Sequence, residues 1–144
     1  RAMEDSGIPR DPDLLFSLSD TSRQAGYETM NAALARGRDF SAAVCLNDLA
    51  AFGAIAAAQE SGIRVPDELS ITGFDALPDD GTENIELTSV YFDRQLMGKM
   101  AVRRIYDAQP EEMESRELLP VHITPKSSTQ IYTPDAAALS MNFG

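Results

Sequence analysis

A recurring unit of apolar run, capping residue and helix restricts the fold of this chain more than any other feature. The uninterrupted apolar run at residues 42–46 leads into Asn47 and Asp48, and an alanine-rich segment at residues 49–61 follows and ends at Gly62. Such a run is typical of a buried strand, and glycine commonly ends a helix. Strands joined to helices by such short connections predict parallel pairing and right-handed crossovers, which places the chain in the α/β class.

The same rhythm occurs on both sides of this unit. Residues 22–36 place Tyr27, Met30 and Leu34 at steps of three and four, which predicts an amphipathic helix that ends at Gly37. The remaining expected elements are strands at residues 14–18, 69–74 and 87–92, helices at 1–6 and 94–107, and extended segments at 118–124 and 127–132.

Composition excludes several classes of protein. The 144 residues carry 12 Lys and Arg against 23 Asp and Glu, and the formal net charge of −11 repels phosphate backbones. No stretch approaches the about 18 apolar residues of a membrane span, and the acidic start is unlike a signal peptide. One Cys and one His exclude a disulfide framework or a His/Cys zinc cluster within the chain. We therefore expect a cytoplasmic protein whose own residues bind neither nucleic acid nor membrane.

Polar residues follow three successive predicted strands. Asp20 follows the first strand, Asn47 the second and Asp75 the third. Because ligands of open parallel sheets bind outside the carboxyl ends of the strands, two carboxylates and one amide are expected at one edge. Each residue has an alternative interpretation, since Asp20 or Asn47 could cap a helix and Asp75 could form a turn. The coincidence of all three indicates a binding site.

The other reactive side chains do not form a catalytic or cofactor site. Cys45 lies within an apolar run without a neighbouring base, which is typical of an inert core thiol, and we expect His122 to be structural or exposed. No glycine-rich phosphate loop follows a strand, and Leu77 and Pro78 occupy positions where a calcium loop needs oxygen atoms. The sequence therefore predicts no enzyme activity, no cofactor and no metal.

Several segments resemble the effector-binding core of the LacI/GalR family of bacterial transcription regulators. The resemblance runs in register over roughly residues 1–129 and is carried by AGYETM at 25–30, AAVCLNDLAAFGA at 42–54, GIRVPDELSITGFD at 62–75, LTSV at 87–90, LMG at 96–98 and SST at 127–129. It implies a periplasmic-binding-protein-like (type I) fold, here a parallel-sheet, three-layer αβα subdomain that is incomplete at its N-terminus.

The resemblance also implies a division of the chain. Residues 1–86 correspond to the C-terminal effector-binding subdomain without its first strand, and residues 87–132 to a crossover strand, helix and strands that normally complete the N-terminal subdomain. We expect residues 133–144 to be disordered. Without the N-terminal subdomain, one face of the helix at 94–107 should be left in water, and this face consists of Leu96, Met97, Met100, Ala101 and Ile105.

Site residues follow from the resemblance position by position. Asn47 and Asp75 match the amide and the carboxylate that hydrogen-bond the effector. Thr21 falls where many members have an aromatic residue that stacks on the effector, and Phe92 falls where glutamine is frequent. Phe52 matches a position of the dimer interface, and the alternative that it packs on its own sheet stays open.

The implied function is effector sensing by a homodimer that controls operator DNA through a helix-turn-helix headpiece outside this chain. The edge is rich in acceptor oxygens, and residues 19–22, 47–48 and 75–86 contain no Lys or Arg. This predicts a neutral, polyhydroxylated effector such as a sugar or nucleoside. The alternative is a periplasmic sugar-binding protein of a transport system, which shares the fold and the cleft.

Overall fold

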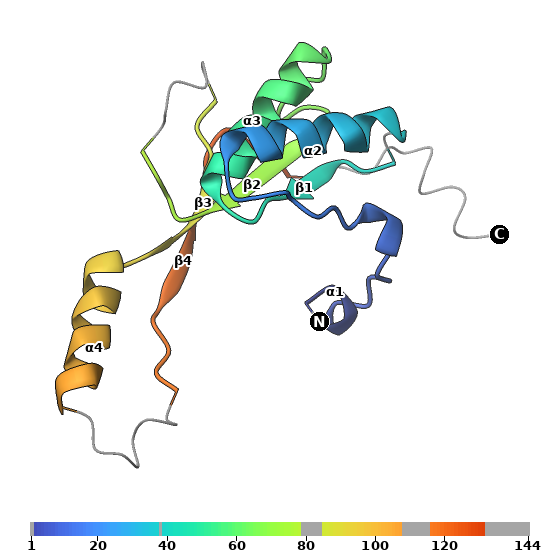
Figure 1. Ribbon diagram of the computed structural model, residues 1–144. Coiled ribbons are helices and arrows are strands. Elements are labelled where there is room, and N and C mark those ends of the chain that lie inside the picture. The colour runs from blue at the N-terminus through green and yellow to red at the C-terminus, as the bar shows by residue number, and fades with distance from the viewer. Residues whose placement is uncertain (1, 38, 79–84, 108–115, 132–144) are drawn as a thin grey trace.

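The computed structural model describes residues 2–37, 39–78, 85–107 and 116–131. Figure 1 shows two helices lying over one face of a sheet, and a helical arm that extends away from this body. The elements in chain order are α1 (Ala2–Asp5), the 3-10 helix η1 (Pro12–Leu14), α2 (Arg23–Ala35), β1 (Ala42–Val44), α3 (Asp48–Glu60), β2 (Ser70–Phe74), β3 (Thr88–Phe92), α4 (Arg94–Asp107) and β4 (Val121–Thr124).

The sheet has the strand order β1-β2-β3-β4. β1, β2 and β3 run parallel, with Ala43 opposite Ile71 and Gly73 opposite Ser89. β4 returns antiparallel to β3. The parallel pairing predicted from the strand–helix rhythm is therefore confirmed, and the fold is a mixed α/β fold with a mainly parallel sheet.

The helices α2 and α3 pack backbone against backbone. A Cβ on Gly26 would lie 2.1 Å from the carbonyl oxygen of Ala50, and a Cβ on Gly53 would lie 1.9 Å from that of Arg23. Alanines fill most of the remaining contact, so the helices approach more closely than larger side chains would permit. This close contact fixes the two helix starts relative to each other.

The hydrophobic core lies between α3 and the sheet. Phe52, Ile55, Leu69 and Ile71 are among the largest fully buried side chains. The opposite face of the sheet is open in the described part of the chain, where Val44 is 88% exposed. The described residues thus build two of the three layers expected from the family resemblance.

The expected strand at residues 14–18 is not formed. η1 covers Leu14, and no backbone pairing joins the following residues to another strand within the described ranges. Leu14 and Leu15 are 42% and 54% exposed. An apolar run becomes a strand only when a neighbouring strand takes up its backbone N–H and C=O groups, and such a partner is not supplied here.

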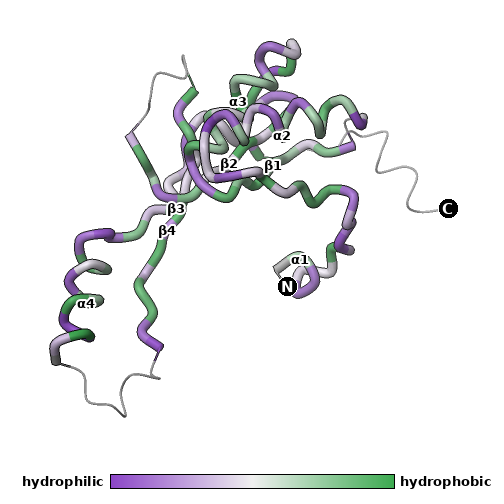
Figure 2. Tube along the Cα trace, viewed as in Figure 1, coloured by the Kyte–Doolittle hydropathy of each residue, from purple (hydrophilic) through white to green (hydrophobic). Residues whose placement is uncertain are grey.

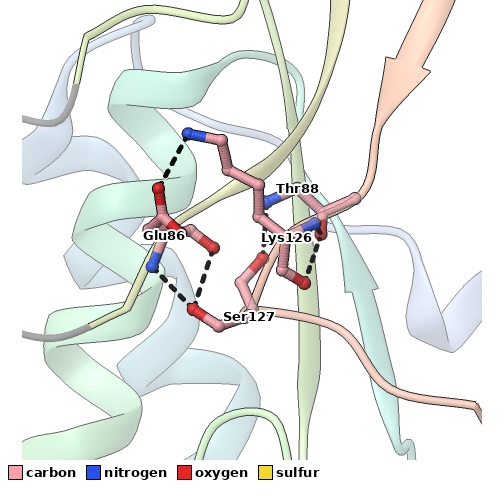
Figure 3. A network of polar contacts seen from close by, with 5 residues as sticks. Glu86, Thr88, Lys126 and Ser127 are labelled. Atoms are coloured by element: carbon pink, nitrogen blue, oxygen red, sulfur yellow. Dashed lines mark hydrogen bonds and ion pairs between the residues drawn. The ribbon is translucent and has the colours of Figure 1, made fainter.

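Beyond β4, the chain returns to the start of β3 through a network of polar contacts (Figure 3). The N–H of Lys126 donates to Thr88 Oγ1 at 2.8 Å, and the N–H of Glu86 donates to Ser127 Oγ at 2.8 Å. Lys126 Nζ also lies 3.3 Å from Glu86 Oε1. These contacts hold the returning segment against the end of the sheet that is opposite to the strand carboxyl ends.

Ser128 completes this closure inside the sheet. It is fully buried, its hydroxyl donates to the carbonyl of Ile71 at 2.6 Å, and its Oγ accepts the N–H of Thr88 at 2.8 Å. The segment at 127–132 was expected to be extended. Its described residues are instead irregular, because one serine bridges β2 and β3 in place of a strand.

The arm formed by α4 and β4 carries apolar residues outside the body (Figure 2). Met97 is 45% exposed, Ile105 80% and Ile123 65%. The sequence-based expectation that this helix face is left in water is therefore confirmed for Met97 and Ile105. No helix in the described ranges has the length and apolar content needed to cross a membrane.

Candidate functional site

Two helix starts meet at the carboxyl edge of the sheet. α2 begins after Ser22, whose Oγ accepts the N–H of Ala25 at 3.2 Å, and α3 begins after Asn47, whose Oδ1 accepts the N–H of Ala50 at 2.9 Å. Asn47 Nδ2 also donates to the carbonyl oxygen of Thr21 at 3.0 Å. This last bond joins the loops that precede the two helices and brings two predicted site residues into contact.

Asp20 lies in the first of these loops and is exposed. Its Oδ1 accepts the N–H of Ser22 at 2.7 Å, which forms a local turn. Hydrogen bonds from the Ser22 hydroxyl and then from its backbone N–H lower the pKa of Asp20 below its usual value. The side chain is therefore ionised at neutral pH and acts only as an acceptor.

The loop after β2 has an unusual backbone. Asp75 and Ala76 have φ angles of 117° and 48°, a region that non-glycine residues seldom occupy. The N–H of Asp75 donates to the carbonyl of Val90 at 3.0 Å, and the N–H of Ala76 donates to Ser89 Oγ at 3.0 Å. Both bonds end on β3, so the turn that carries the Asp75 carboxylate is held against the neighbouring strand.

Arg94 adds a cation that the sequence analysis missed. Its guanidinium donates to the backbone carbonyl of Asp75 and lies 5.9 Å from the centroid of the Phe92 ring. The Phe92 and Phe74 rings are 5.6 Å apart. The charge of the edge was predicted from the loops at residues 19–22, 47–48 and 75–86, and Arg94 lies outside all three. Extending the strand-end rule to the strand at 87–92 finds Arg94 two residues beyond its end.

The structure thus places all five predicted binding residues at one edge. Asn47 contacts Thr21 directly, and Asp20 precedes Thr21 in the same loop. Asp75 is joined to the start of α3 through the N–H of Leu77, which donates to Asp48 Oδ2 at 2.6 Å. Phe92 reaches Asp75 through Arg94 and Phe74. The cap for Asn47 and the turn for Asp75, which were the alternative interpretations, are also present, so these residues have structural bonds as well.

Phe52 does not have the position expected for a subunit contact. Its side chain is 1% exposed and belongs to the core cluster with Ile55 and Ile71. The alternative that Phe52 packs on its own sheet is therefore the one that the structure shows. Its expected role in a dimer interface stays a prediction, and burial of the side chain leaves almost no surface for a direct contact with a second subunit.

The other reactive side chains, Cys45 and His122, are not part of this candidate site. Burial raises the pKa of the Cys45 thiol to about 11, which keeps it protonated and unreactive. The His122 ring lies 4.8 Å from that of Tyr91 on the exposed arm. Throughout the described ranges, no group of three or more His, Cys, Asp or Glu side chains could hold a metal ion.

Comparison with known proteins identifies the family. The periplasmic binding protein-like domain family matches residues 1–129. The chain belongs to this family. Within it, the sequence is similar to the HTH-type transcriptional repressor PurR of Pasteurella multocida, at 32% identity over 122 residues that make up 85% of this chain and 36% of PurR. The chain therefore spans little more than a third of the length of this relative.

Solved structures agree with this assignment. The complex of the transcriptional regulator CelR with cellobiose superimposes with a TM-score of 0.74 at 27% identity, over 88% of this chain and 39% of CelR. The lac repressor dimer bound to operator and the anti-inducer ONPF gives 0.69 at 29% identity, over 76% and 39% of the two chains. These proteins are transcription regulators. The chain thus carries part of the effector-binding domain of a LacI/GalR-type regulator, and the transport-protein alternative is not favoured.

Proposed function

We propose that this domain binds a small, neutral, polyhydroxylated effector, such as a sugar or nucleoside, at the carboxyl edge of its sheet. The observation that carries the proposal is the bond from Asn47 Nδ2 to the Thr21 carbonyl, together with the link between Leu77 and Asp48. These bonds join three loops that are far apart in sequence, namely the loop before α2 and the loops after β1 and β2. Ligands of open parallel sheets bind at this edge.

The donors and acceptors at the edge suit hydroxyl groups. The Asp20 and Asp75 carboxylates accept hydrogen bonds, and Asn47 can both accept and donate. Among the described residues the amide of Asn47 makes two bonds, which use one of its N–H groups and one lone pair and leave one of each for a ligand. Phe92 offers an apolar ring at the same edge, against which the C–H groups of a sugar can pack.

The balance of charge favours a neutral ligand. The single positive charge of Arg94 is outweighed by the two negative charges of Asp20 and Asp75 at the same edge. The Asp75 carbonyl also takes up part of the hydrogen-bonding capacity of Arg94. The chain as a whole carries a net charge of −11. A phosphorylated ligand would therefore be repelled more strongly than its parent compound.

Binding acts on DNA only through residues outside this domain. An allosteric switch is a coupling between two sites, and here the second site is a helix-turn-helix headpiece that contacts the operator. The lac repressor, whose structure superimposes on this chain, is a dimer bound to operator DNA, and this supports a homodimer for this regulator. The protein would work in the cytoplasm and would catalyse no reaction, as its relatives are repressors rather than enzymes.

Isothermal titration calorimetry on the complete regulator tests the proposal with cellobiose, lactose, glucose, adenosine and glucose 6-phosphate. Asn47→Ala and Asp75→Asn should each make the binding free energy of whichever compound binds less favourable by about 1–3 kcal/mol, the usual cost of an unpaired buried group. Asp67→Asn is the matched control, since Asp67 lies in an exposed turn before β2. Unchanged affinity in both site variants, or a preference for glucose 6-phosphate over glucose, would refute the site or its charge.

A further inference from the structure

Asp48 is a buried carboxylate beside the candidate site. It is the first residue of α3, its exposure is 0%, and it directly follows Asn47. A buried carboxylate is unfavourable unless hydrogen bonds replace its lost hydration. Its Oδ1 accepts the Ser89 hydroxyl at 2.6 Å, and its Oδ2 accepts the N–H of Leu77 at 2.6 Å. Both oxygens are thus engaged by groups outside the helix.

The N–H groups of two consecutive residues in the turn after β2 are linked to this carboxylate by hydrogen bonds. The N–H of Leu77 reaches it directly, and the N–H of Ala76 reaches it through Ser89, whose Oγ accepts from Ala76 and whose hydroxyl donates to Asp48. The preceding residue, Asp75, has the φ angle of 117°. Such a backbone is unfavourable for a non-glycine residue and persists only where the surroundings fix it.

Strand β2 leaves room for the carboxylate at one glycine. A Cβ on Gly73 would lie 2.2 Å from Asp48 Oδ1 and 2.9 Å from a methyl group of Leu87. Any side chain at this position would displace Asp48 from its hydrogen bonds. The carboxylate is therefore enclosed between β2 and β3, where its position depends on both strands and on α3.

We infer that Asp48 is a positioning residue, which holds the turn at residues 75–77 in the conformation that presents the Asp75 carboxylate to the effector. The inference rests on the proposed function for its link to binding. Asp48 and Asn47 are consecutive residues at one helix start, so the same element places the amide of the site and the turn that carries its carboxylate.

The chemistry requires a carboxylate at this position. Both partners of Asp48 are donors, so both of its oxygens must accept. An asparagine amide has nearly the same shape but offers one oxygen and one NH₂ group. In Asp48→Asn, an NH₂ group that faces Leu77 cannot accept its N–H, and one that faces Ser89 reverses that bond and leaves the Ser89 hydroxyl proton without its acceptor, so the native pattern of bonds is lost in either orientation without a change in volume.

Nuclear magnetic resonance on the ¹⁵N-labelled chain tests this role without any ligand. Residues with positive φ give strong intraresidue amide–Hα cross-peaks, so Asp75 and Ala76 should show them in the wild type. In Asp48→Asn these cross-peaks should weaken, and amide exchange at Leu77 should accelerate at least about tenfold relative to Ile71, whose N–H donates to the Ser128 carbonyl in the sheet. A role in global stability alone would accelerate both amides equally and would overturn the inference.

Two further variants make the result specific. Asp93→Asn is the matched control, because Asp93 is exposed and caps α4 by accepting the N–H of Leu96 at 2.9 Å. It should leave the turn unchanged. Ser89→Ala keeps the bond between Asp48 and Leu77 but removes the relay to Ala76, so exchange should accelerate at Ala76 more than at Leu77. Should Asp48→Asn not fold, this difference decides the inference, and equal acceleration at both amides would overturn it.

A binding arm separates this inference from the proposed function. With cellobiose, lactose, glucose and adenosine as probes, any affinity that Asp75→Asn lowers should fall about tenfold or more in Asp48→Asn and stay unchanged in Asp93→Asn. A loss in Asp75→Asn without a loss in Asp48→Asn would overturn the positioning role and leave the proposed function standing. If Asp75→Asn alters no affinity, the proposed function fails, and the exchange data still decide whether Asp48 holds the turn.

Discussion

Replacing Gly53 with alanine should destabilise the fold, because the new methyl group has no space between α2 and α3. Its Cβ would lie 1.9 Å from the carbonyl oxygen of Arg23 and 2.6 Å from the amide nitrogen of Tyr27. Ordinary contacts of a Cβ begin at 3.4 Å. The two backbones must therefore separate locally by about 1.5 Å, since neither contacting atom belongs to a flexible side chain.

The magnitude follows from two opposing effects. Overpacking a close-packed contact costs about 1–3 kcal/mol, and the upper end applies here because the separation also opens the close approach of Gly26 to Ala50 on α3. Alanine recovers about 1 kcal/mol of helix propensity relative to glycine. A net loss of about 2 kcal/mol is expected, out of the 5–15 kcal/mol that stabilise a typical domain.

Urea unfolding followed by far-UV circular dichroism measures this loss. Gly98→Ala is the matched control, because Gly98 also lies inside a helix but has no atom within 4 Å of an added Cβ. That variant should be as stable as the wild type or up to about 1 kcal/mol more stable. A Gly53→Ala variant with wild-type stability, or equal losses in both variants, would refute the argument that the helices touch backbone to backbone.

Three further results are expected. Ser128→Ala should lower the free energy of unfolding by about 1–3 kcal/mol, because it leaves the Ile71 carbonyl and a strand amide unpaired, whereas the exposed Ser127→Ala should cost less in the same urea titration. Burial raises the pKa of the Cys45 thiol in the folded protein. The buried neutral thiol therefore stabilises the fold below the thiol pKa of the unfolded chain, and this stabilisation is lost as the pH rises to about 11. Unfolding measured as a function of pH, and slow thiol labelling of the native protein at pH 8, check this expectation. Asn47→Asp should keep the helix cap but loses the donor that bonds the Thr21 carbonyl, so it should lower the melting temperature and weaken effector binding in calorimetry.

The parts of the fold that local signals specify were predictable from the sequence. α2 and α3 begin and end within about a residue of their expected bounds, because Ser22 and Asn47 cap them and Gly37 and Gly62 end them with φ angles of 106° and 75°. β2 and β3 follow their apolar runs in the same way. The strand-end rule then located the candidate site without knowledge of any contact.

The parts that depend on distant residues were not predictable. No local pattern marks Asp48 as buried, and only its bonds to Ser89 and Leu77, 41 and 29 residues away, show its position inside the fold. Ser128 bridges two strands from a segment that has no strand pattern of its own. The run at residues 14–18 has strand composition, yet it lacks a partner, and composition alone does not reveal whether one is present.

Capping and ligand binding are not competing roles for Asn47. An amide side chain has two donor hydrogens and two acceptor lone pairs, and capping the N–H of Ala50 uses one lone pair while the bond to Thr21 uses one hydrogen. The capped geometry therefore fixes the amide plane, and the described residues take up neither the second donor nor the second acceptor. Because the cap holds the side chain in a single orientation, binding an effector would require little further loss of side-chain entropy. A residue just beyond the end of a strand can thus begin a helix and still offer a donor and an acceptor of the same amide to a ligand.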